Sequence, residues 1–128
     1  MAVNVLVADD SAVMRAMMIR TLRLSGIALG EIHEAADGGD GLRILGSRSV
    51  QLVLIDVNMP VMDGLEMLKQ ARRRTRRKMA VVVVSSDGSE RRAAAVRRRG
   101  AQFLAKPFAP EDLREAIIRS LGAAHVGS

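Results

Sequence analysis

Leu52-Val53-Leu54-Ile55-Asp56 is the stretch that most constrains the fold, because an unbroken apolar run ends there in a carboxylate. Aliphatic runs of this kind are typical of strands buried on both faces of a parallel sheet. A similar run, Val5-Leu6-Val7-Ala8, is followed directly by Asp9 and Asp10. If the two runs are neighbouring parallel strands, all three carboxylates converge at one edge of the sheet.

Segments of strand-like and helix-like periodicity alternate along the rest of the chain. Strands are predicted at 4–8, 31–35, 51–55, 80–84 and 103–105. Helices are predicted at 11–24, 41–45, 65–71, 90–99 and 110–121, and residues 37–39 are predicted to form a turn. This alternation predicts an α/β domain with a five-stranded parallel sheet and helices on both of its faces.

Length and composition limit the class of protein. We expect a single domain over residues 1–128, with a core at about 4–121, a frayed tail at 122–128 and no output domain. Apolar residues make up 48% of the chain and cysteine is absent, which excludes disulfides and thiolate metal sites. No apolar run approaches the roughly 18 residues of a membrane span, and the first residues do not resemble a signal peptide, so we expect a cytoplasmic protein.

The ends of the predicted strands carry groups suited to phosphate and metal chemistry. Besides Asp9, Asp10 and Asp56, they include Ser85 and Lys106. Three carboxylates this close cannot all ionise without a cation, and Mg²⁺ (with Mn²⁺ as a substitute) suits carboxylate oxygens. A carboxylate can accept a phosphoryl group, and a hydroxyl and an ammonium can bind its oxygens. The simpler alternative, solvated polar residues at strand ends, accounts for any one of them but poorly for the set.

The chain resembles the receiver domain of two-component response regulators, in particular the stand-alone, CheY-like receivers. This resemblance implies a doubly wound (βα)5 flavodoxin/CheY-like sheet with strand order 2-1-3-4-5. It covers residues 4–121. The matching motifs are Val7-Ala8-Asp9-Asp10-Ser11 with Met14-Arg15, Asp37-Gly38, Asp56 to Gly64, Val82 to Ser86, and Ala105-Lys106-Pro107-Phe108.

The resemblance implies a phosphorylation site and a metal site that share one carboxylate. Asp56 is expected to accept the phosphoryl group. Asp10, Asp56 and the backbone carbonyl of Asn58 are expected to bind Mg²⁺ directly, and Asp9 to help through water. Lys106 is expected to pair with the phosphoryl group.

The resemblance also implies a switch next to this site. Ser85 is expected to bond the phosphoryl group, and Phe103 to turn inward when Ser85 moves. The alternative for Phe103 is an ordinary core residue. The Lys106-Pro107 bond is expected to be cis. Asn58 and Asp87 are expected to tune the lifetime of the aspartyl-phosphate, which we place at seconds to minutes.

These implications describe a single-domain response regulator in signal transduction, with chemotaxis or motility as the leading pathway. A histidine kinase donates the phosphoryl group, and the protein is not an enzyme beyond its own phosphorylation and dephosphorylation. One alternative is a phosphorelay intermediate that passes the group to a histidine phosphotransfer protein. Two others are a Mg²⁺-dependent phosphatase of the haloacid dehalogenase type and a receiver that signals by binding alone.

Arginine is unusually abundant, and the formal net charge is +6. Two basic runs, 72–78 and 91–99, carry much of the excess. They are either solvated helix surface or a docking site for an acidic partner, such as a flagellar switch protein, on the face formed by the fourth helix, fifth strand and fifth helix. Nucleic acid is disfavoured because no DNA-binding module follows, and no membrane contact is expected.

Overall fold

The computed structural model describes residues 2–74 and 78–126. Five parallel strands form one sheet in the order β2-β1-β3-β4-β5, which is the expected order. The strands are β1 (Val3–Ala8), β2 (Leu29–Ala35), β3 (Leu52–Asp56), β4 (Ala80–Ser85) and β5 (Gln102–Ala105). The helices are α1 (Ala12–Leu24), α2 (Gly38–Ser47), α3 (Gly64–Arg74), α4 (Glu90–Arg98) and α5 (Pro110–Val126).

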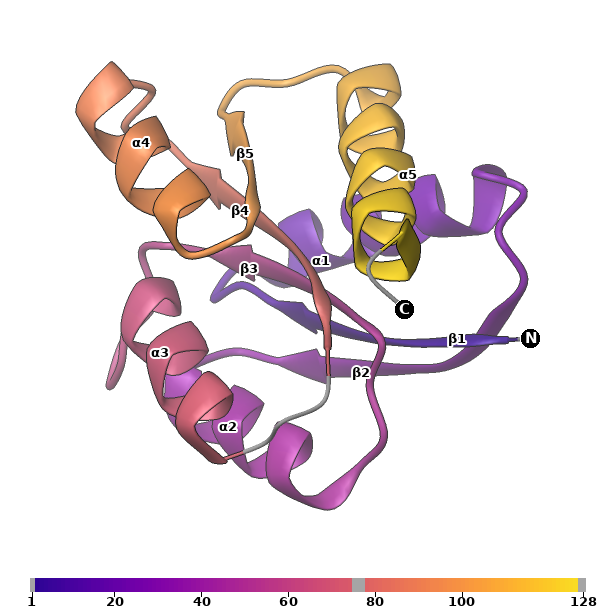
Figure 1. Cartoon of the computed structure of the whole chain (residues 1–128), viewed down its shortest axis with the longest axis horizontal. Helices are drawn as coiled ribbons and strands as arrows, with labels where there is room; N and C mark the ends of the chain where they lie inside the picture. The colour runs from indigo at the N-terminus through magenta and orange to yellow at the C-terminus, as the bar shows by residue number, and fades with distance from the viewer. Residues whose placement is uncertain (1, 75–77, 127–128) are drawn as a thin grey trace.

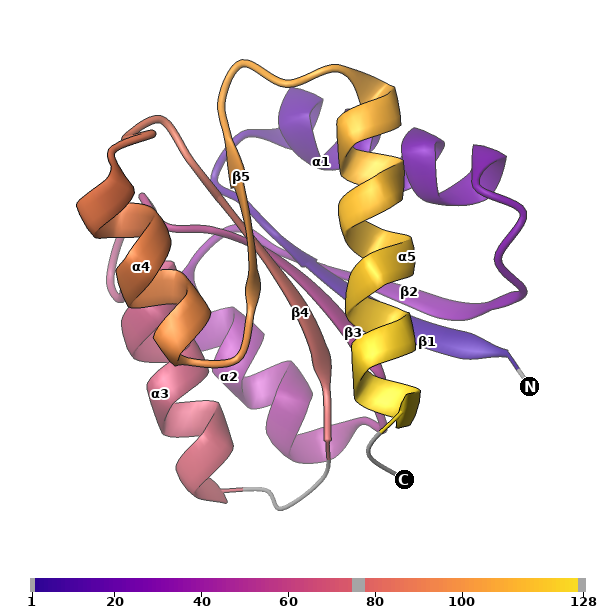
Figure 2. The same cartoon turned by 45° about the horizontal axis from the view of Figure 1, so that its top comes forward.

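Helices cover both faces of the sheet, so the predicted α/β architecture is confirmed. Helices α1 and α5 lie on one face, and α2, α3 and α4 lie on the other (Figures 1 and 2). The strand side chains alternate between the two layers: Val53 and Ile55 join the core under α2, α3 and α4, whereas Leu52 and Leu54 join the core under α1 and α5. This double burial explains why the strand sequence is apolar without interruption.

The central strand β3 and its neighbour β4 contain no exposed residue. Each fully buried valine, leucine or isoleucine contributes roughly 1.5–3 kcal/mol through removal of its side chain from water. The sheet therefore forms a rigid base, and the residues that follow its strands are held at fixed positions along one edge.

Helix ends follow local capping chemistry. The hydroxyl of Ser11 accepts a hydrogen bond from the Met14 amide at 3.2 Å, and Ser89 caps α4 in the same way through the Arg92 amide at 3.2 Å. Gly100 follows α4 with a φ of 75°, a left-handed conformation that side chains disfavour. These caps explain why the predicted boundaries of α1 and α4 are close to the observed ones.

The prediction for α2 was wrong at its start. Residues 37–39 do not form a separate turn, because the Asp37 carboxylate accepts a hydrogen bond from the Asp40 amide at 2.8 Å and caps a helix that begins at Gly38. Gly38 is required there, since a β-carbon would overlap the backbone carbonyl of Met62. Asp37 thus caps the first turn of α2, and Gly38 lets the β3–α3 loop approach that turn, a contact that local sequence does not reveal.

Other boundaries differ modestly from prediction. Helix α5 continues to Val126, so residues 122–126, which were expected to fray, are helical. The last part of the predicted tail, 127–128, and residues 75–77 of the first basic run lie outside the described residues. Among the helices of the described part, none has the length and apolar character needed to cross a membrane.

Val61, in the loop between β3 and α3, has an unfavourable backbone conformation. Its φ is 70°, in the left-handed region, and its side chain is 86% exposed. A β-branched side chain at such a φ clashes with its own backbone. Because the side chain is so exposed, its burial contributes little free energy to offset this strain. Val61 therefore makes the folded state less stable than a residue that tolerates the left-handed region would.

We therefore predict that Val61→Asn raises the free energy of unfolding by about 1 kcal/mol, because asparagine tolerates the left-handed region. Urea denaturation monitored by far-UV circular dichroism measures the change. Val13→Asn is the matched control, since Val13 is 81% exposed but lies in the helix α1. An unchanged or lower unfolding free energy for Val61→Asn would contradict the assignment of strain.

Candidate phosphoryl-acceptor and metal site

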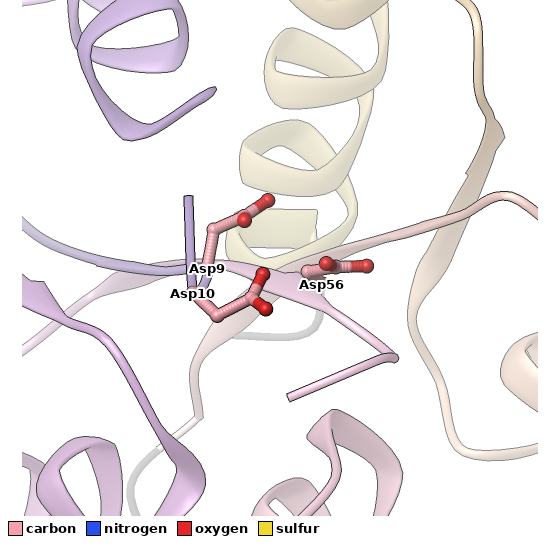
Figure 3. Close-up of side chains that lie close together, drawn as sticks. All are labelled: Asp9, Asp10 and Asp56. Carbon is pink, nitrogen blue, oxygen red and sulfur yellow. The ribbon is translucent and has the colours of Figure 1, made fainter. Parts of the chain in front are cut away.

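Asp9, Asp10 and Asp56 meet beyond the carboxyl ends of β1 and β3, which are neighbours in the sheet (Figure 3). One carboxylate oxygen from each residue lies within 4.8 Å of those of the other two. Asp9 and Asp56 are buried, whereas Asp10 is exposed. The parallel pairing of the strands thus brings together carboxylates that are far apart in the sequence.

Hydrogen bonds hold one oxygen of each buried carboxylate. Oδ1 of Asp9 accepts from the Ser11 amide at 2.9 Å, and Oδ1 of Asp56 accepts from the Asn58 amide at 3.3 Å. The other oxygens face Lys106, whose Nζ lies 3.3 Å from Oδ2 of Asp56 and 3.6 Å from Oδ2 of Asp9. Lys106, at the end of β5, therefore supplies the cation nearest to both buried acids.

One ammonium does not satisfy the buried carboxylates. Oδ2 of Asp9 has no hydrogen-bond partner among the described residues, although it is fully buried. Burial raises the pKa of Asp9, and the charge of Asp56 adds to this increase; the Ser11 amide and Lys106 oppose it only in part. Ionised Asp9 consequently costs folding free energy in the absence of a further cation.

The donor set fits Mg²⁺. Three carboxylates close together, one of them open to solvent and one with an unpartnered oxygen, match the preference of Mg²⁺ for a few carboxylates plus water. Asp9, Asp10 and Asp56 would hold the ion, and the backbone carbonyl of Asn58 remains a predicted ligand. Mn²⁺, with similar oxygen ligands, fits the same set.

Ser85 lies at the end of β4, beside the acidic cluster, and is fully buried. Its hydroxyl oxygen accepts a hydrogen bond from the Asp87 amide at 3.0 Å, and its carbonyl accepts from the Lys106 amide at 2.8 Å. The second contact ties β4 to the start of the β5–α5 loop, where the Lys106-Pro107 bond is cis, as the resemblance implied. Ser85 and Lys106 are thus held relative to each other by backbone.

Asn58 and Asp87, the residues expected to tune the lifetime of the aspartyl-phosphate, lie on neighbouring loops, β3–α3 and β4–α4. The side-chain Nδ2 of Asn58 donates to the Ser86 hydroxyl at 3.3 Å and links the β3–α3 loop to the end of β4. The Asp87 carboxylate accepts from the Ser89 amide at 3.0 Å, and this hydrogen bond lowers its pKa, with a smaller contribution from Arg92. Both side chains therefore have defined partners within the described chain.

Phe103 is half-buried in β5 and packs against the core under α2, α3 and α4. It is neither exposed nor fully enclosed, which is compatible both with the expected switch role and with an ordinary core role. Its predicted inward rotation concerns a second state of the protein, so it stays a prediction.

Arg15 is a residue of the site to which the sequence analysis assigned no role. Its Nη1 donates to the backbone carbonyl of Asp9 at 2.7 Å, and its Nε donates to Glu34 at 3.0 Å. It braces the end of β1 against β2 and so fixes the backbone that carries Asp9 and Asp10. The sequence offered one signal for this role. Arg15 follows Asp9 by six residues and lies in the first turn of α1, so its side chain can reach back to Asp9.

Gly64 has a comparable supporting role under Asp56. A β-carbon at Gly64 would overlap the backbone carbonyl of Asp56 and the side chain of Ile55. The Gly64 amide also donates to the carbonyl of Val57 at 2.9 Å. The start of α3 thus packs directly against the strand end that presents Asp56, and only glycine allows this approach.

The response regulator receiver domain family matches residues 5–118 of this chain. The chain belongs to this family. It is 30% identical to the chemotaxis protein CheY of Bacillus subtilis over 121 residues, covering 94% of this chain and 99% of that protein. The solved structure of the chemotaxis response regulator CheY4 of Vibrio cholerae superposes with a TM-score of 0.83 at 32% identity, covering 94% of this chain and all of that one.

A third relative is much longer. Over 65 residues the chain is 48% identical to protein-glutamate methylesterase/protein-glutamine glutaminase 2 of Caulobacter vibrioides. This alignment covers 51% of this chain and 18% of that protein. The chain thus spans under a fifth of this relative and nearly all of CheY. Membership in the receiver family means that the chain is a receiver domain of two-component signalling, and the family match gives no support to the haloacid dehalogenase alternative.

We predict that Asp9→Asn stabilises the metal-free protein at neutral pH, by on the order of 1 kcal/mol. With the folded-state pKa raised, stability falls as pH rises from the ordinary carboxyl pKa to the raised value, and the full penalty is present above it. The variant lacks this penalty. Urea denaturation with EDTA and with saturating Mg²⁺ measures both effects, and wild type should gain more from Mg²⁺ than the variant.

Asp10→Asn is the control for this measurement, because Asp10 is exposed and its replacement should change metal-free stability less. A metal-free Asp9→Asn protein less stable than wild type would show that Lys106 already compensates the buried charge.

Proposed function

We propose that this receiver accepts a phosphoryl group on Asp56 from a histidine kinase and thereby switches its binding to a protein target. The observation that carries the proposal is the environment of Asp56. Its carboxylate is buried at the end of a central strand, 3.3 Å from the Lys106 ammonium and within 4.8 Å of two further carboxylates. Carboxylate nucleophiles that form acyl phosphates need this combination of a fixed oxygen and nearby positive charge.

In the proposed transfer, a carboxylate oxygen of Asp56 attacks the phosphorus of a protonated phosphohistidine. The new O–P bond forms as the N–P bond breaks, and the electron pair of the broken bond stays on the ring, which leaves as neutral imidazole. The Asn58 amide holds Oδ1 of Asp56, so the nucleophile has little rotational freedom. When bound, Mg²⁺ would reduce the repulsion between the acids and the phosphoryl oxygens.

Lys106 and Ser85 would then hold the transferred group. The ammonium of Lys106 lies close enough to Asp56 to pair with a phosphoryl oxygen. The Ser85 hydroxyl oxygen accepts from the Asp87 amide and makes no other hydrogen bond with the described residues, so its proton is available for a second phosphoryl oxygen. A move of Ser85 toward that oxygen would loosen its contact with Asp87 at the start of α4.

This loosening supports the proposed switch. The Asp87 carboxylate contacts the Ser89 amide and lies 3.6 Å from Nε of Arg92, so it joins the Ser85 loop to α4. Phe103 packs nearby in β5 and would rotate inward as the loop shifts. The two packings would then differ at the face formed by α4, β5 and α5, where we propose that the target binds.

The likeness to chemotaxis proteins supports chemotaxis or motility as the pathway. A cytoplasmic location is part of this proposal. A component of the flagellar switch is the proposed target. The chemistry of Asp56 is independent of that choice, so the two parts of the proposal are tested separately.

We predict that acetyl phosphate with Mg²⁺ adds one phosphoryl group to the wild-type protein. Intact-mass spectrometry measures the addition, and EDTA should abolish it because the three acids then repel the phosphate. Asp56→Asn should remain unmodified. Asp63→Asn is the matched control, since Asp63 lies in the same loop but caps α3 through the Glu66 amide, and it should be modified like wild type. Modification of Asp56→Asn would overturn the assignment.

We further predict that the aspartyl-phosphate decays with a half-life of seconds to minutes. The polar side chains of Asn58 and Asp87 flank the strand ends and can orient an attacking water. Rapid removal of donor, followed by acid quenching at intervals and mass analysis, measures the decay. A half-life of many hours would mean that these side chains exclude water from the phosphoryl group.

A further inference from the structure

The edge of the sheet opposite Asp56 carries a dense group of cations. Helices α3 and α4 both run away from the phosphoryl site and end at the amino edge of β4 and β5 (Figure 2). Their last turns bring together parts of the two basic runs. We call the following residues the amino-edge cluster: Arg72, Arg73, Arg74, Lys78, Arg97, Arg98 and Arg99.

The arginines of the cluster have few acidic partners. Among those that the structure describes, one pairs with a carboxylate: Arg97, whose Nη1 lies 3.2 Å from Oε1 of Glu90. Arg72, Arg73 and Arg98 make no ion pair or side-chain hydrogen bond with the residues that the structure describes. Favourable interaction with the helix dipole accounts for a cation or two at a helix C-terminus, but it extends over only one turn and does not require three successive arginines on each of two helices.

A cavity of about 260 Å³ opens beside this cluster, and two residues of the cluster, Arg72 and Lys78, line it. Its polar lining includes Arg72, Lys78, Gln102 and Ser120, and its apolar lining includes Met79 and Val81. Arg72 is exposed as a whole, but its Nη2 lies next to Gly100, and partial burial lowers its pKa. The cavity therefore combines a partly desolvated guanidinium with a small apolar area contributed by Met79 and Val81, which are themselves buried.

A glutamate side chain matches both features. Its carboxylate can form paired hydrogen bonds with a guanidinium, and its two methylene groups can cover the small apolar area. A side chain projecting from an extended peptide can enter a cavity of this size, whereas a nucleic acid duplex presents its phosphates on a broad convex surface. Single-stranded nucleic acid fits poorly because the chain has only two aromatic residues, Phe103 and Phe108, and neither belongs to the cluster.

We infer that the amino-edge cluster binds a glutamate-rich segment of a protein partner, with one glutamate in the cavity beside Arg72. This surface lies at the edge of the sheet opposite Asp56. It adjoins the α4-β5-α5 face, to which the sequence analysis assigned an acidic partner, because Gln102 of β5 and Ser120 of α5 line the cavity. Arg92 at the other end of α4 is already near Asp87, at 3.6 Å, so the second basic run divides into two parts. The inference does not depend on phosphorylation of Asp56.

The test is fluorescence anisotropy with a fluorescein-labelled peptide of alternating glutamate and glycine, added to unphosphorylated protein. The triple variant Arg72→Gln/Arg73→Gln/Arg98→Gln should bind about tenfold more weakly than wild type, since three arginines of the surface lose their charge. The matched control is Arg20→Gln/Arg23→Gln/Arg114→Gln. It removes the same charge from exposed positions on α1 and α5, on the other face of the sheet, and should lose less than about threefold.

Circular dichroism and modification by acetyl phosphate confirm that both triple variants are folded. Equal weakening by the two variants would overturn the inference, because it would indicate attraction by net charge alone. Absence of peptide binding by wild type would also overturn it. Tighter binding of a DNA duplex than of the peptide would overturn the inference as well, because it would identify nucleic acid as the partner of this surface.

Discussion

Repulsion between three carboxylates at the ends of two adjacent strands is the constraint that organises this protein. Asp9 and Asp56 are buried by the same sheet that fixes their positions, and a single ammonium, that of Lys106, lies between them. The surrounding residues hold the acids in place without neutralising them: Arg15 braces the backbone of Asp9, and Gly64 lets α3 support Asp56. The fold thus maintains a site with an excess of negative charge, and that excess favours binding of a divalent cation.

Much of this arrangement could be predicted from the sequence, because strand burial and strand ends have strong local signals. Val53 and its neighbours are apolar without interruption since both faces of β3 are covered, and Asp56 is conspicuous because it ends that run. The alternation of strands and helices then requires the acids to share one edge. The strand order itself did not follow from periodicity; it came from the motifs around Asp56 and Lys106, which resemble those of receiver domains.

The features that were missed depend on contacts between distant segments. Gly38, in the first turn of α2, lies against Met62, and no pattern within residues 37–41 indicates that contact, although the Asp37 cap was a local signal for the helix start. Val61 reads as an ordinary apolar loop residue until its φ is known. The two arginine runs look like separate stretches of helix surface, and only the parallel course of α3 and α4 places Arg72 next to Gly100, the residue that follows Arg99.

The separation of charge between the two edges of the sheet has a physical consequence for encounters with other molecules. Carboxylates lie at one edge of the sheet and guanidinium groups at the other. This separation gives the protein a dipole moment along its strands. The electric field of an approaching charged molecule acts on that dipole moment, so the receiver rotates into a preferred orientation before the two surfaces touch. An anion approaches the edge with the arginines first, and a cation approaches the edge with the aspartates. Dissolved salt weakens this orientation because it shortens the range of the electrostatic interaction.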